Sequence, residues 1–250
     1  MRDTFSFKTA YVIAKREFAA YFATPLAAVF LTIFVAATGA FAFYIGGFFV
    51  RGQANLDAFF AYHPWLYLLL VPAVAMRLWA EERKTGTIEL LMTLPVSPTE
   101  AILGKFAAAW AFIGLALVLT FPIWITVNVL GDPDNGVIIA SYLASFLLAG
   151  AFLAIGAFIS ALTKNQVIAF ILSATVCFLL VTSGMEIVQN TLRTWAPTLV
   201  ADAVSSMSFL THYERITRGV ISLDTIVFFV SLIAFALFAN VIAISQKKSA

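Results

Sequence analysis

Six long apolar runs follow one another along the 250-residue chain, and more polar segments of different lengths separate them. The runs cover residues 26–50, 59–76, 106–130, 137–163, 167–188 and 225–245. The first has 25 residues and as a helix would be about 38 Å long, enough to cross the hydrocarbon core of a bilayer. Each run therefore predicts a transmembrane helix. Pro64 is expected in the first turn of the second helix, and Pro72 and Pro122 are expected to kink the second and third.

The segment before the first run, residues 5–24, shows helical periodicity of a different kind. Aromatic and small residues recur every three or four positions at Phe7, Tyr11, Ala14, Phe18, Tyr21 and Phe22. The charged residues Lys8, Lys15 and Arg16 lie off this stripe. The pattern is typical of an amphipathic helix in the inner membrane interface, with Lys8, Tyr11, Lys15, Arg16 and Phe18 as its contact residues. A frayed extension of the first span is the open alternative.

Residues 189–224 form the other short amphipathic segment. Leu199, Val200, Ala203, Val204, Met207 and Leu210 recur at helical spacing, and Asp202 and Ser205 fall on the other face. A helix over these residues is too short to cross a bilayer. We therefore expect a re-entrant or surface helix on the outer side, not a seventh span.

Composition agrees with these patterns and excludes several classes of protein. Hydrophobic residues make up 62% of the chain and charged residues 11%, with a mean hydropathy of +0.97. A soluble enzyme or a disordered chain would carry far more charge, and the net charge of +2 is too small for a nucleic-acid binder. The chain is expected to be an all-α membrane protein over residues 1–250. It would have six transmembrane helices, an N-terminal interfacial amphipathic helix and a re-entrant or surface segment before the last span.

Lysine and arginine indicate the orientation, since they are concentrated in cytoplasmic loops. With the N-terminus inside, the inner segments hold Arg2, Lys8, Lys15, Arg16, Arg77, Arg83, Lys84, Lys105, Lys164, Lys247 and Lys248. The outer loops hold Arg51, Arg193, Arg215 and Arg218. Both termini are therefore expected in the cytoplasm of a multi-pass protein.

The residue types that carry chemistry are scarce. The spans have no charged relay near the bilayer centre, as ion-coupled carriers need, and no filter motif of a channel is present. His63 and His212 are expected in outer loops, with His63 at a helix start, and no H-E-x-x-H motif occurs. Lys105 follows a glycine, but the residues around it do not match a phosphate-binding loop. The single Cys177 excludes an intrachain disulfide. No metal, cofactor or catalytic residue is expected in this chain.

The inner connection over residues 77–105 is the most structured loop. Gly86 is placed to end a helix in the left-handed conformation, and Thr87 to begin a short new one that stops at Pro95. Ser97-Pro98-Thr99-Glu100 is a capping box that predicts the start of the third span's helix. The loop is thus expected to hold a short, rigid helix at the cytoplasmic surface.

This loop resembles a known signature. Glu82 to Pro95 fits the E-x-x-x-G-T-x-E-x-L-x-x-x-P pattern of type-2 ABC exporter permeases. The Lys15-Arg16-Glu17-Phe18 segment that ends near Pro25 is also similar to that family. Pro64-Trp65, Pro72-Ala73 and Met76-Arg77 look most like its gliding-motility-associated branch. The resemblance covers the whole chain.

The resemblance implies a permease of the bacterial inner membrane that has no nucleotide site and works with separate ATPase subunits, which bind ATP and Mg²⁺. Two permease copies, identical or related, would form the pathway. The helix around Thr87–Leu94 would be the coupling helix, and the turn at Thr163–Gln166 a second ATPase contact. The residues expected at the ATPase are Glu81, Glu82, Gly86, Thr87, Ile88, Glu89, Leu91, Met92, Pro95, Lys164 and Asn165.

Two other hypotheses stay open. The chain could be an ATPase-coupled anchor that pulls on an outer accessory protein, in gliding or envelope assembly, without transporting a substrate. It could also be an autonomous carrier or channel, which the absence of midplane charges disfavours. Asp202, His212, Glu214 and Arg215 are weak candidates for an outer gate, and a solvated loop would explain them equally well.

Overall fold

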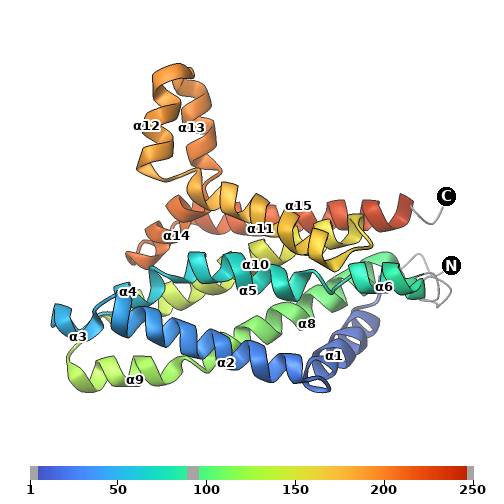
Figure 1. Ribbon diagram of the computed structural model, residues 1–250, viewed down its shortest axis with the longest axis horizontal. Helices are drawn as coiled ribbons and strands as arrows, with labels where there is room; N and C mark the ends of the chain where they lie inside the picture. Colours follow the sequence, from blue (N-terminus) through green and yellow to red (C-terminus); the bar gives the residue numbers. More distant parts are fainter. Residues whose placement is uncertain (1–4, 89–95, 247–250) are drawn as a thin grey trace.

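The computed structural model describes residues 5–88 and 96–246, and within them every regular element is helical and none is a strand. The helices form an elongated bundle from which one hairpin projects sideways (Figure 1). Their bounds are α1 (Phe7–Phe22), α2 (Pro25–Ala40), the π-helical η1 (Phe41–Ile45), α3 (Phe48–Arg51), α4 (Asp57–Phe60), α5 (His63–Ala75), α6 (Ala80–Thr85), α8 (Pro98–Val118), α9 (Phe121–Leu130), α10 (Asn135–Leu162), α11 (Gln166–Thr182), α12 (Glu186–Trp195), α13 (Thr198–Ser206), α14 (Phe209–Thr217) and α15 (Leu223–Gln246).

Side chains at the helix starts explain where several elements begin. Ser97 and Glu100 form the predicted capping box of α8, which is confirmed. Asp134 accepts hydrogen bonds from the N–H groups of Gly136 and Val137, and Asn165 accepts from those of Val167 and Ile168. Pro64 lies in the first turn of α5, as the sequence predicts. Local sequence therefore fixes most of the starts of the long helices.

Five segments are long and apolar enough to cross a membrane: Ala27–Arg51, Asp57–Thr85, Pro98–Leu130, Asn135–Leu162 and Leu223–Gln246. A sixth candidate is α11 together with α12, which are bent by 78° at the break between them. With 17 residues, α11 alone is about 26 Å long. The start of α1 and the end of α15 lie at the same end of the bundle as α6 (Figure 1), which agrees with an even number of crossings. The fold is an all-α membrane protein.

Two spans are interrupted near prolines. In the second span, α5 continues past Pro72, where a kink was predicted, and ends at Ala75. The helix resumes as α6 at Ala80. The hydroxyl of Ser160 on α10 bridges this break: it donates to the carbonyl of Met76 and accepts from the N–H groups of Trp79 and Ala80. The third span breaks between α8 and α9, with Pro122 in the first turn of α9. Pro122 thus marks the break that the sequence predicts.

The segment before the last span differs from the prediction. The fifth span ends at Thr182, not Val188, and the single short helix expected around Leu199–Leu210 is two helices, α13 and α14. Ser208 separates them because its hydroxyl accepts the N–H of Thr211 and caps α14. A helix-forming apolar pattern runs across this cap, so periodicity alone misses it.

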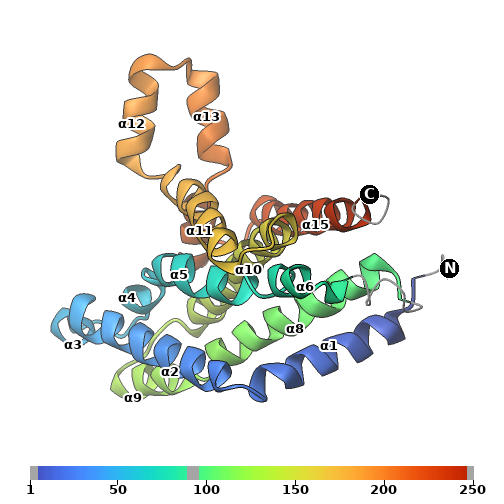
Figure 2. The same ribbon diagram turned by 45° about the vertical axis from the view of Figure 1, so that its right-hand side comes forward.

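The core centres on α10, whose small side chains allow close packing on both sides. Nineteen of its 28 residues are buried, and it packs against α5, α8, α11, α14 and α15. The amphipathic helix over residues 5–24 is confirmed as α1, but it packs lengthwise against the first half of α8 (Figure 2). This packing brings the N-terminal helix to the same end as the loop at 77–105.

Candidate functional site

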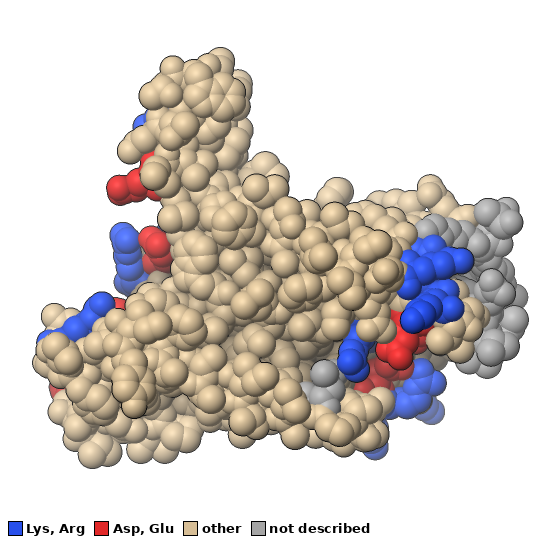
Figure 3. Space-filling view, viewed as in Figure 1, with Lys and Arg blue, Asp and Glu red and all other residues tan. Residues whose placement is uncertain are grey.

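Charged side chains gather at the end of the bundle where α1, α6 and the start of α8 meet (Figure 3). The loop between α10 and α11, residues 163–165, lies at the same end. These elements come from four separate parts of the sequence. We call this set of elements the inner face.

A buried lysine joins three elements of the inner face. Lys105 on α8 is 4% exposed, and its Nζ lies 2.6 Å from Glu82 Oε1 of α6 and 3.4 Å from Glu17 Oε2 of α1. The same Nζ lies 5.3 Å from the ring centroid of Trp79, within reach of a cation–π interaction. The pairs are 23 and 88 residues apart in sequence. One ammonium group thus holds α1, α6 and α8 together.

The electrostatics of this cluster favour the charged form of Glu17. Burial raises the pKa of Glu17, but Lys105 and Arg16 beside it outweigh burial, so the pKa of Glu17 lies below its usual value. Glu82 Oε2 is buried and has no hydrogen-bond partner among the described residues. Lys105 is therefore the main compensation for two partly buried carboxylates.

Glu100 makes a second link between α1 and α8. Its Oε2 accepts the N–H of Ser97 at 2.8 Å, and its Oε1 accepts the N–H of Ser6 at 2.7 Å. Ser6 in turn caps α1 by accepting the N–H of Thr9. The capping box predicted for α8 therefore also fixes the start of α1, which the sequence did not reveal.

Arg83 links the two inner segments that the sequence predicts as separate ATPase contacts. It donates to the carbonyl of Ala161 near the end of α10, two residues before the predicted turn. That turn is present, with Asn165 as the cap of α11. Beside this link, Glu81, Lys84, Lys164 and Asn165 have exposed side chains. The exposed side chains of α6 and of the 163–165 turn therefore lie beside one hydrogen-bonded link between the two segments.

The remaining predicted coupling residues fall into two groups. Gly86 ends α6 with φ of 75°, so the left-handed cap is confirmed, and helix resumes at Thr87 and Ile88. Ile88 is half-buried against the protein's own core, and Thr87 Oγ1 donates to the carbonyl of Glu82. Glu89, Leu91, Met92 and Pro95 lie outside the described residues.

Gly86 offers a simple test of the cap. No atom lies within 4 Å of a Cβ added there, so only backbone strain opposes a side chain. We expect Gly86→Ala to destabilise the helix end by about 1 kcal/mol, near the lower cost of a left-handed residue. Gly86→Val should cost more because its β-branched side chain tolerates this conformation less. Thermal unfolding in detergent measures both, and equal stability of the two variants would contradict the cap.

The predicted interfacial residues lie along α1. Lys8, Tyr11, Lys15 and Arg16 are exposed, and Arg16 pairs with Glu17 at 2.7 Å. Phe18 packs against the bundle instead, and so do Ile13 and Tyr21. The aromatic stripe is thus divided between the bundle and the surface.

The expected outer-loop position of His63 is wrong. His63 is fully buried at the start of α5, where Nδ1 lies 2.9 Å from Ser145 Oγ, which lies 2.8 Å from the hydroxyl of Tyr67. His63 packs among Phe34, Phe59 and Phe60. The helix-start position is confirmed, but this histidine belongs to the packed interior.

The four weak outer-gate candidates do not form one cluster. His212 on α14 is buried, stacks on Phe228 with centroids 4.0 Å apart and bonds the carbonyl of Ser206 through Nε2. Glu214 pairs with Arg218 and Arg215 with Asp224. Asp202 lies on α13 and pairs with Arg193. Each of the three charged candidates thus pairs with a residue close to it in sequence.

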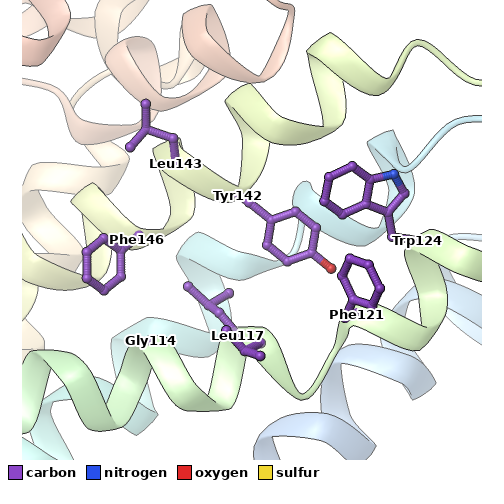
Figure 4. Close-up of a pocket in the computed structure, with 8 residues that line it drawn as sticks. Gly114, Leu117, Phe121, Trp124, Tyr142, Leu143 and Phe146 are labelled. Atoms are coloured by element: carbon purple, nitrogen blue, oxygen red, sulfur yellow. The ribbon is translucent and has the colours of Figure 1, made fainter.

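An apolar groove of about 470 Å³ lies where α8, α9 and α10 meet (Figure 4). Its lining includes Leu117, Phe121, Trp124, Tyr142 and Phe146. The polar groups of the two amphipathic side chains are already bonded: Tyr142 to Thr120, and Trp124 to Asn135. The groove is suited to hydrocarbon and offers no chemistry for a reaction.

Comparison with known protein families identifies the family of this chain. The model of a family described as ABC-2 family transporter protein matches residues 11–246. This range includes all the described spans and the inner face. No curated protein matches the chain.

Proposed function

Because the chain belongs to the ABC-2 family of transporter proteins, we propose that it couples ATP hydrolysis in a separate ATPase subunit to export across the bacterial inner membrane. It is a membrane permease component with several apolar helices. The energy source, the partner subunits and the direction are the proposed part.

The observation that carries the proposal is the joined inner face. Arg83 of α6 joins the end of α10, which is far away in sequence, and exposed polar residues lie beside that link. A soluble partner that binds such a rigid surface can displace it as one unit, because its parts cannot move independently. We place the ATPase contact at Glu81, Glu82 and the residues that follow Gly86, with Lys164 and Asn165 as the second contact.

The ion pairs of Lys105 indicate how a movement at the inner face would reach the spans. ATPase closure would displace α6, and Lys105 would carry the displacement to α8 and α1. The break between α5 and α6, bridged by Ser160, would let α6 tilt without unfolding the span. Two permease copies would then rock between inward-open and outward-open states.

The orientation and subgroup belong to the same proposal. The concentration of Lys and Arg at the inner face supports a cytoplasmic position for both termini. The motifs at Pro64, Pro72 and Met76 support the gliding-motility-associated branch, and Pro72 and Met76 flank the end of α5. Export and force transmission to an outer protein would use the same inner face.

Affinity purification from the native host in mild detergent tests this proposal. We expect a P-loop ATPase to co-purify in stoichiometric amount and to lose association when Glu81 and Lys164 are both reversed in charge. A chain that purifies without an ATPase, under conditions that keep other membrane complexes intact, would contradict the proposal. An additional outer-face protein in the complex would favour force transmission.

A further inference from the structure

The hairpin formed by α12 and α13 stands away from the bundle (Figures 1 and 2). It is bent by 78° from α11 and therefore runs nearly at right angles to a crossing helix. Each of its two helices buries one residue, Gln189 in α12 and Ala201 in α13. Helices of ten and nine residues are marginal in water without a surface to cover them.

Each helix of the hairpin has one apolar and one polar side. Residues Ile187, Val188, Leu192 and Trp195 of α12 lie within about 140° of its circumference, and so do Leu199, Val200, Ala203, Val204 and Met207 at α13. Ile187, Trp195 and Leu199 are 70%, 73% and 81% exposed. These large side chains have little protein around them.

An ion pair shows how the two sides are arranged. Arg193 and Asp202, each on the polar side of its helix, pair across the hairpin at 3.4 Å. Both side chains stay more than half exposed, at 59% and 68%, so the pair lies on the surface of the hairpin, and the apolar side of each helix is turned away from it.

The direction of these faces relative to the bundle is visible in the space-filling view. Charged atoms of the hairpin lie on its edge turned toward the α3 end of the bundle, and the opposite edge shows none in Figure 3. The charged edge thus faces the nearer end of the spans, and the uncharged edge faces their middle. Amphipathic helices at a bilayer surface have this arrangement, with the charged side toward water and the apolar side toward the lipid.

We propose that the α12–α13 hairpin lies flat in the headgroup region of the outer leaflet, with the apolar sides of both helices on the acyl chains and Trp195 at the boundary. The partner is the lipid surface itself. The 78° bend sets the hairpin in the membrane plane, and the charged edge then meets water. A second copy packed on the apolar face would not explain why the charged edge of the hairpin is turned toward the α3 end of the bundle (Figure 3). The inference does not depend on the ATPase partner.

The bend that places the hairpin depends on a close approach at Gly184. A Cβ there would lie 2.7 Å from the Cβ of Ser208 and 2.5 Å from Thr211 Oγ1, so a larger residue would force the start of α14 to shift. Gln189 also donates to the carbonyl of Ser183 at 2.6 Å. The hairpin is therefore held at a fixed angle and is not a freely swinging loop.

Site-directed spin labelling tests the proposal on the full chain in vesicles of phosphatidylethanolamine and phosphatidylglycerol. In a Cys177→Ala background, single cysteines replace Ile187 and Leu199 on the apolar face, and Asn190 and Asp202 on the polar face. Phe235 on α15, 72% exposed, gives the lipid reference, and Asp132 gives the water reference. Collision rates with oxygen and with a water-soluble nickel chelate are measured at each position.

We expect the ratio of oxygen to nickel collision rates at Ile187 and Leu199 to approach that at Phe235 and to exceed that at Asn190 and Asp202 several-fold. Free access of nickel to all four positions would show that the hairpin stands in water and would overturn the proposal. Protection of Ile187 and Leu199 from both reagents would also overturn it, because it would indicate that a second copy covers the apolar face.

Discussion

Replacing Lys105 by methionine is expected to have a large effect on both stability and coupling. The variant keeps the aliphatic packing but leaves Glu82 without its paired cation and Glu17 with Arg16 as its remaining ion-pair partner among the described residues. The side chains of Glu17 and Glu82 are 22% and 24% exposed, so the cost should lie between that of a surface pair and a buried pair, at about 2–3 kcal/mol. Under the proposed coupling mechanism, movement of α6 should also no longer reach α1 and α8.

Thermal unfolding in detergent and ATPase activity of the complex measure the two effects. Lys164→Met is the matched control for the unfolding measurement, since it removes an exposed lysine of the same face without disturbing the cluster. Glu17→Gln and Glu82→Gln added to Lys105→Met should restore part of the lost stability, because no uncompensated carboxylate then remains. If Lys105→Met melts like Lys164→Met, the cluster does not hold the inner face together.

The stability that the cluster provides also depends on pH in a defined direction. The pKa of Glu17 is lowered in the folded protein, so its contribution is fully present above the ordinary pKa of a glutamate. It is lost as the pH falls through the lowered value, where the carboxylate takes up a proton. The loss should be absent in Glu17→Gln.

The second large effect is expected at the contact between α1 and α8. A Cβ on Gly104 would lie 2.8 Å from the Cβ of Ile13 and 2.9 Å from the carbonyl oxygen of Ala10. The carbonyl oxygen of Ala10 belongs to the backbone of α1, so even the small side chain of alanine must displace α1 from α8. We expect Gly104→Ala to destabilise the protein by about 1–3 kcal/mol, as overpacked cores do.

Gly39→Ala provides the control for this prediction. Gly39 is also helical, but the nearest atom to its added Cβ is 3.9 Å away, in the Phe43 ring. Alanine should therefore stabilise that helix by about 0.5–1 kcal/mol through its better helix propensity. Opposite signs of the change in melting temperature are expected for the two variants. A stabilised Gly104→Ala protein would show that α1 is not held closely against α8.

Local signals in the sequence were sufficient for most of the fold. The apolar runs give the spans, and the box at Ser97–Glu100, the glycine at 86 and the proline at 122 mark helix ends correctly. These features depend on residues close together in sequence. The cap at Ser208 was missed because the apolar periodicity of α13 continues into α14 across it.

The long-range parts of the inner face could not be predicted in the same way. Lys105 is next to an apolar run, and nothing in its neighbourhood identifies Glu17, 88 residues away, as a partner. The signal that was available is the position of a lone lysine at the start of a membrane span, where a buried cation needs compensation. His63 shows the converse error: it was expected in an outer loop, but it is buried in the bundle, where it contacts Ser145 of the distant helix α10.

Site-specific photo-crosslinking in native cells tests the central claim most directly. A photoreactive amino acid placed at Glu81 or Lys164, on the exposed part of the inner face, is compared with the same residue at Asp132, exposed at the opposite end of the bundle. The account predicts that Glu81 and Lys164 crosslink to a P-loop ATPase and that Asp132 does not. Crosslinks to an ATPase from neither inner position, with the protein inserted and folded, would contradict the coupling role of this face.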